Sequence, residues 1–187
     1  MAFHGDFYEP TKAGRMFWMV SAATGVVIPI YTTTAPTFGI LNPVGSVVDV
    51  VLHELLVGLY DTTGAATNLW ASFQNSATGP ATGSKVTALT VAARGTEYEN
   101  CKIFDGPPTA VQPFPLTATL TAASEMHMPL GLSQLVTTFA DATVTPFELR
   151  HDFKSLIVPP GTFFQIVGAK APLTKYNFKL LWEEVAA

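Results

Sequence analysis

Charged residues are scarce in this 187-residue sequence. They make up 13% of the chain, against an average of about 25% in soluble domains. Lys and Arg never occur in runs longer than a residue or two, so the sequence argues against binding to the phosphate backbone of a nucleic acid. A surface this poor in charge needs covering, and we therefore expect a partner protein or a homo-oligomer.

Cysteine is nearly absent as well. Cys101 stands alone, so no disulfide can form within the chain. Its neighbours Asn100 and Lys102 supply neither a base nor a strongly electropositive setting, which a catalytic thiol requires. We interpret Cys101 as a small hydrophobic residue.

The sequence also lacks the spacings that mark metal sites and catalytic centres. No two of its four histidines lie two or four residues apart; they are His4, His53, His127 and His151. His53–Glu54 and His151–Asp152 are adjacent pairs, which a regular strand would point to opposite faces. The paired acids Glu183 and Glu184 would diverge in the same way, and there is no G-x-S-x-G elbow or phosphate-binding glycine loop. We expect no enzyme activity, no metal and no cofactor.

Long hydrophobic runs are missing too. The apolar segment Met16–Tyr31 is shorter than the roughly 20 residues of a membrane span. Asp6 and Glu9 precede it where a signal peptide would be basic, and Pro29 interrupts it. We interpret the segment as two strands with a turn near residues 23–25, and we expect no membrane association.

The sequence does contain short extended segments separated by turn residues, and this pattern is clearest near its C-terminus. Leu156–Val158 leads into a Pro-Pro-Gly corner, Thr162–Val167 follows, and Lys175–Glu184 closes the pattern. About nine to eleven short strands are predicted, with no alternation of strand and helix. The prediction is an all-β fold, an antiparallel β-sandwich of jelly-roll type with long loops, over residues 15–187, preceded by an irregular N-terminal arm over residues 1–14.

The longest apolar segment, Ser46–Tyr60, is ambiguous. Its many valines favour one long bent strand. Asp49 and His53 fit neither the strand period nor the helix period, so a helix remains the alternative. Gly58 suggests a bulge or close packing.

Four aromatic residues are candidates for an interface. Phe3, Phe7 and Tyr8 lie in the arm, which would dock either on a neighbouring subunit or on its own domain. Phe114 stands between Pro113 and Pro115, in a stretch predicted to run extended over the surface.

Three stretches resemble structural proteins of tailed-bacteriophage heads: Thr37–Ser46, with the strand that follows it to Tyr60; Leu156–Val167; and the closing Leu181–Glu184. The resemblance implies a capsid cement or decoration protein with a jelly-roll fold and no catalytic residues. Such a virion protein would be assembled in the host cytoplasm and bind the capsid exterior. Its partners would be the major capsid protein and further copies of itself, as a dimer or trimer.

Two other functions stay open on the sequence. Trp18, Trp70 and Trp182 would serve as a sugar-stacking platform, with the polar loop Gln74–Ser84 beside it, in a carbohydrate-binding or host-recognition module such as a head fibre or tail-spike domain. The turn at Pro159–Gly161 also resembles the second motif of cupin enzymes. The histidines that bind metal in that family have no counterpart here.

Overall fold

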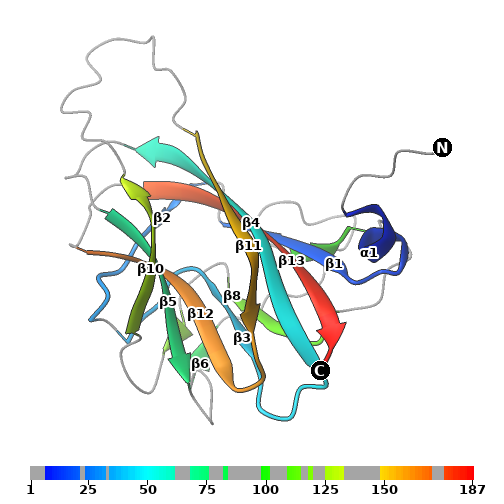
Figure 1. The fold of residues 1–187 in the computed structure, drawn as a ribbon. Helices are drawn as coiled ribbons and strands as arrows, with labels where there is room; N and C mark the ends of the chain where they lie inside the picture. The colour runs from blue at the N-terminus through cyan, green and yellow to red at the C-terminus, as the bar shows by residue number, and fades with distance from the viewer. Residues whose placement is uncertain are drawn as a thin grey trace.

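The computed structural model describes residues 7–21, 24–32, 34–61, 68–75, 82–83, 98–101, 109–114, 118–119, 125–132, 148–169 and 175–187, and the structural statements below concern these residues. They form two antiparallel sheets, a separate two-stranded ribbon and one short helix (Figure 1). The all-β prediction is confirmed. No helix in these ranges has the length and apolar character needed to cross a bilayer.

The first sheet is built around the long strand near the C-terminus. Its strands, in spatial order, are β11 (Glu148–Val158), β4 (Val48–Asp61), β13 (Lys175–Ala186), β1 (Met16–Val20) and β7 (Tyr98–Asn100). A further short strand, β2 (Val26–Val27), also pairs with β13. The predicted strand that begins at Val26 is therefore shorter than expected, and Pro29, which has no N–H to donate, contributes only its carbonyl oxygen to Gly168 at 2.8 Å.

The second sheet lies against the first. Its strands, in spatial order, are β10 (Glu125–Leu132), β5 (Asn68–Asn75), β12 (Thr162–Gly168), β3 (Gly39–Asn42) and β8 (Gln112–Phe114). The separate ribbon pairs β6 (Thr82–Gly83) with β9 (Ala118–Thr119). Every residue of β12 is buried, as expected of a strand covered on both faces.

Apolar side chains from the two sheets meet in one core. Alternate residues of β13 face inward and are buried: Tyr176, Phe178, Leu180 and Trp182. The ring centroid of Phe178 lies 5.0 Å from that of Phe38, which precedes β3. Phe153 of β11 packs edge-on against Phe164 of β12, with ring centroids 5.7 Å apart. Burying a large apolar side chain stabilises the fold by about 1.5–3 kcal/mol, so these contacts hold the sheets together.

The ambiguous segment Ser46–Tyr60 is a strand, so the helix alternative is wrong. The register with β13 skips His53, because Leu181 pairs with Glu54 and Trp182 pairs with Leu52. This bulge shifts the inward face by one residue, from Leu52 to Leu55, which explains why the sequence fits neither period.

The bulge also overturns the prediction that His53 and Glu54 face apart. His53 contacts Glu183 and Glu54 pairs with Arg150, both on the outer face of the first sheet. The expectation for Gly58 is wrong as well. Gly58 pairs in regular register with Asn177, and a Cβ there would meet only ordinary contacts, the nearest at 3.8 Å.

The N-terminal arm is not wholly irregular. Its described part contains the five-residue helix α1 (Tyr8–Lys12), with Glu9 in its first turn and Lys12 in its last. These charges complement the helix dipole.

Candidate contact surface

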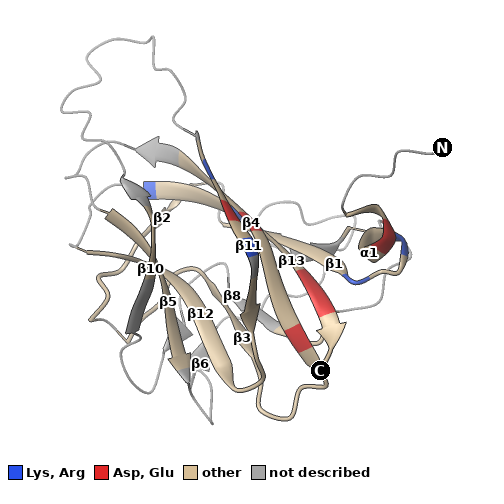
Figure 2. Ribbon diagram, in the orientation of Figure 1, with Lys and Arg blue, Asp and Glu red and all other residues tan. Residues whose placement is uncertain are grey.

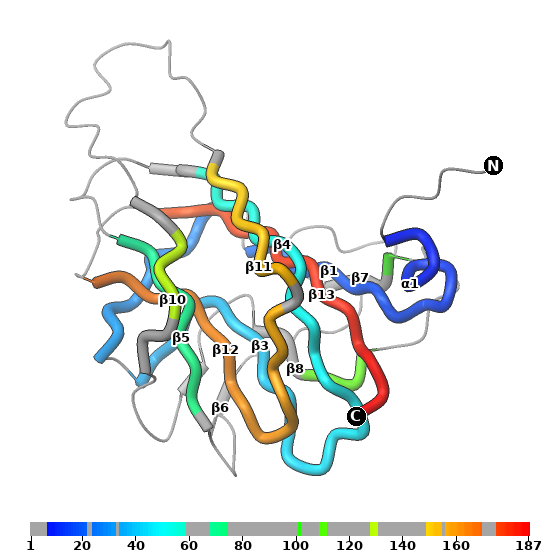
Figure 3. The backbone as a smooth tube through the Cα atoms, viewed as in Figure 1, coloured from blue at the N-terminus to red at the C-terminus, as the bar shows by residue number. Residues whose placement is uncertain are grey.

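Two tight turns lie side by side at one end of the molecule, next to the C-terminus (Figure 3). In the β3–β4 turn, the Ser46 N–H donates to the Pro43 oxygen at 3.1 Å, and Gly45 has φ +80°. In the β11–β12 turn, the Thr162 N–H donates to the Pro159 oxygen at 3.2 Å, and Gly161 has φ +82°. Glycine adopts this left-handed conformation without steric cost. The Pro-Pro-Gly corner at the β11–β12 turn was predicted from the sequence and is confirmed.

Asn42 fastens the two turns together. Its side chain is fully buried, and its Nδ2 donates to the carbonyl oxygens of Val48 and Val158, each at 2.9 Å. The backbone carbonyl oxygen of Asn42 accepts the Gly161 N–H at 2.8 Å. The turns are thus held by hydrogen bonds between segments more than a hundred residues apart in sequence, which makes this end a preorganised surface.

We call residues 42–48 and 156–163 the turn end. It contains no Asp, Glu, Lys or Arg, and Figure 2 shows both turns without charged residues. Its exposed apolar side chains are Val44 (61% exposed), Val47 (76%) and Ile157 (54%). Exposed aliphatic side chains on an uncharged surface can be buried by another protein without taking a charge out of water. The turn end therefore offers a rigid, uncharged contact surface and no acid–base chemistry.

Sequence reasoning missed these three residues. The sequence places Val47 in the apolar segment Ser46–Tyr60 and Ile157 in the strand before the Pro-Pro-Gly corner, and predicts exposure for neither. The available signal was a valine inside the Asn-Pro-Val-Gly turn, because the middle of a tight turn projects into solvent.

The predicted interface residues do not form one cluster. Phe3 lies outside the described residues. Phe7 and Tyr8 are 38% and 43% exposed at α1, where the Phe7 ring packs on His53 of β4 with centroids 4.9 Å apart. Phe114 lies in the edge strand of the other sheet, with its backbone paired to Gly39. Phe7 thus contacts its own sheet, and docking of the arm on a neighbouring subunit stays a prediction.

A polar cluster lies where α1 meets the first sheet. Glu183 accepts from Arg15 Nη2 at 3.0 Å and lies 3.4 Å from His53 Nε2. No group of three or more potential metal-binding side chains occurs among the residues that the structure describes. A partly exposed ion pair of this kind contributes at most about 1 kcal/mol. Its evident role is to hold the start of β1 and Phe7 against the sheet.

Glu183 and Glu184 point to opposite faces, as predicted. Glu184 is buried, and its carboxylate accepts the Ala110 N–H at 2.9 Å and the Thr109 hydroxyl. Trp182 Nε1 lies 3.5 Å from the same carboxylate. With these partners Glu184 fixes the segment that leads into β8, and it does not form a catalytic pair with Glu183.

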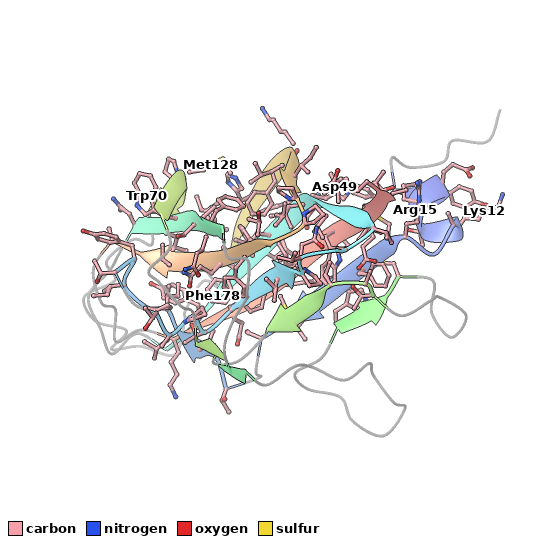
Figure 4. All side chains as sticks on the ribbon, turned by 90° about the horizontal axis from the view of Figure 1, so that it is seen from below. Lys12, Arg15, Asp49, Trp70, Met128 and Phe178 are labelled. Carbon is pink, nitrogen blue, oxygen red and sulfur yellow. The ribbon has the colours of Figure 1, made fainter. Side chains whose placement is uncertain are left out.

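The tryptophans do not form a common platform. Trp182 is fully buried in the core. Trp18 lies between the inward residues Phe17 and Met19, and therefore faces outward from the first sheet, beside the Lys179 ammonium at 5.8 Å. Trp70 faces outward from the second sheet, at the opposite end of the molecule from Arg15 (Figure 4). Sugar stacking on all three is excluded by this arrangement.

Replacing Asn42 with Ala is expected to lower the free energy of unfolding by about 2–3 kcal/mol. The reason is that the buried Val158 oxygen and the partly buried Val48 oxygen would both lose the Asn42 donor, at about 1–3 kcal/mol for each group left unsatisfied. Urea denaturation measures the loss. Ser46→Ala is the control, because the Ser46 hydroxyl makes two long, partly buried contacts, both at 3.3 Å to the backbone of Val48, and it should cost less than about 1 kcal/mol. Equal losses in the two variants would show that Asn42 does not fasten the turns.

Comparison with known proteins adds no identification. No protein-family model matches the chain, and no curated protein and no solved structure matches it significantly. The features that bear on function are therefore the geometry of the turn end and the short stretches that resemble phage head proteins.

Proposed function

We propose that the fold is a jelly roll. The eight longest described strands, counted along the chain, are β1, β3, β4, β5, β10, β11, β12 and β13. Their spatial order is sixth-third-eighth-first in one sheet and fifth-fourth-seventh-second in the other. This is the order that results when an antiparallel hairpin folds into two facing sheets, and it supports a jelly roll, an architecture used by viral capsid and lectin domains.

We propose further that the protein is a non-enzymatic virion component, a cement or decoration protein that binds the outer capsid surface and stabilises junctions between capsomers. The observation that carries the proposal is the turn end, a rigid surface without charge and with three exposed aliphatic side chains. Two of the stretches that resemble phage head proteins, Thr37–Ser46 and Leu156–Val167, contain these two turns. The part of the sequence that suggested the family is therefore also the part that presents a contact surface.

The rigidity and the apolar exposure of the turn end favour binding to a capsid shell built from repeated subunits. A preorganised surface loses little conformational entropy on binding, so more of the apolar burial contributes to affinity. Stable protein interfaces bury about 1,200–2,000 Å², which requires contacts beyond the two turns. Copies bound around a symmetric shell, if they also contact one another, add avidity to modest individual contacts. The expected partner is the major capsid protein.

The test is binding to purified capsids that lack this protein. The wild-type chain should sediment with the capsids and raise the temperature at which they rupture. The double variant Val44→Asp/Val47→Asp should bind at least about tenfold more weakly, since each carboxylate would have to lose water at the interface without a partner.

Val27→Asp is the matched control for this experiment. Val27 is 40% exposed in β2, outside the turn end, so the same substitution there should leave capsid binding unchanged. Equal weakening by both variants would rule out the turn end as the contact. A wild-type protein that ignores capsids but binds saturably on a glycan array would replace this proposal with the carbohydrate-recognition alternative.

A further inference from the structure

The strands at the edges of the two sheets differ in what they offer a partner. An edge strand presents unpaired N–H and C=O groups, onto which another strand can add. Among the described strands, β7 and β8 have three residues each, and β8 contains Pro113. The edge strand β10 contains Pro129 and two register shifts. In β11, by contrast, Glu148–Asp152 pairs with β4 in unbroken register and includes no proline. This stretch is the longest regular edge in the described part of the chain.

The charges along this edge are complementary to themselves. If a second copy of β11 added in antiparallel fashion with a two-fold axis at His151, Arg150 would stand opposite Asp152 of the second copy. Each opposite-charge pair across antiparallel strands contributes about 0.2–1 kcal/mol, and the two-fold axis doubles every pair. We propose that the protein forms a symmetric homodimer by pairing β11 with β11 of a second copy about His151.

The side chains at the centre of this edge fit the arrangement. Arg150 is 70% exposed and Asp152 is exposed, both on the outer face. Arg150 donates to Glu54 of its own chain at 2.5 Å through one nitrogen, and a guanidinium has five N–H groups, so others remain for a partner. Figure 1 shows β11 on the side of the first sheet away from β1.

On this axis His151 of one chain would lie opposite His151 of the second chain, so the charge of its ring affects dimerisation. The His151 ring packs edge-on against Phe153, with centroids 4.9 Å apart. Burial lowers the pKa of His151 below its ordinary value, while the neighbouring Asp152 carboxylate acts in the opposite direction. The ring is therefore neutral at pH 7, and two copies can approach without repulsion.

The register and the extent of pairing are both limited. An axis at Arg150 would place two Arg150 side chains opposite each other, so like charges disfavour it. Beyond Asp152 the strand is irregular: Lys154 has φ +49°, and its N–H donates to Asp152 Oδ1 at 2.8 Å. The irregularity stops the ladder, and a two-fold axis uses each edge once. The product is a closed dimer, and growth into a fibre is blocked.

A charge-exchange experiment tests the dimer without reference to any capsid. Wild-type protein in sedimentation velocity should have twice the mass of one chain. Arg150→Glu and Asp152→Lys should each weaken dimerisation by at least about tenfold, because each places like charges opposite each other twice. Mixing the two variants should restore a dimer that contains one chain of each kind, identified by native mass spectrometry, since every pair across that interface is again opposite in charge.

A dimer restored in the mixture would show that both variants are folded, because a misfolded chain would not form a dimer with the other variant. Lys179→Glu, on the outer face of β13 and away from the edge, is the matched control and should dimerise as the wild type does. A monomeric or trimeric wild type would overturn the proposal. So would variants that dimerise normally alone, or a mixture that remains monomeric.

Discussion

Gly39→Ala is expected to destabilise the protein by at least about 3 kcal/mol, the upper end of the usual range for overpacked cores. Gly39 lies in β3 between β12 and β8. A Cβ at this position would collide with the backbone oxygen of Phe164 and would lie 2.9 Å from Phe163 Cζ. A backbone atom of a central strand cannot move aside, so β3 would have to separate from β12. Urea denaturation followed by circular dichroism measures the loss.

Gly58→Ala provides the control for this substitution. Gly58 also lies inside a strand, but a Cβ there would meet Asn177 at the ordinary distance of 3.8 Å. Its effect should stay within about 0.5 kcal/mol of neutral, and a gain is expected if the lower freedom of alanine in the unfolded chain dominates. A Gly39→Ala variant as stable as Gly58→Ala would contradict the close approach of β3 and β12.

Trp182→Ala should cost about 3–5 kcal/mol, the usual range for removing a large aromatic residue from a core. Trp182 has no exposed surface and stacks on Phe17 of β1, with ring centroids 5.7 Å apart and planes 19° from parallel. Its removal leaves a cavity in the core beside Phe17, and it also takes a polar neighbour from the buried Glu184. Thermal and urea unfolding should both show the loss.

Trp18→Ala tests whether position, rather than residue type, causes that effect. Trp18 lies on the neighbouring strand and faces outward, where its interaction with the Lys179 ammonium is worth about 0.5–1 kcal/mol. With the partial burial of its ring, the total cost should remain below about 2 kcal/mol. Comparable losses from the two tryptophan variants would mean that the first sheet does not have the assigned inner and outer faces.

Gly39 and Trp182 both depend on strands that the sequence predicts. The alternation through Lys175–Glu184 marks Trp182 as buried, and the apolar run Thr162–Val167 marks the strand against which Gly39 packs. The β3–β4 and β11–β12 turns were predictable for a local reason, because Gly45 and Gly161 adopt a left-handed backbone conformation that other residues rarely adopt. The close approach at Gly39 was not predictable, since it depends on a strand more than a hundred residues away.

The sequence by itself determined the all-β class, the two glycine turns and the inward face of β13, because each follows from the conformational preferences and polarity of neighbouring residues. The tertiary structure alone decided the bulge at His53, the fastening of the turns by Asn42 and the exposure of Val44, Val47 and Ile157. It also decided the strand order and the free edge of β11 among the described strands. These features arise from contacts between distant segments, and the order in which strands pair is set by the packing of the whole core.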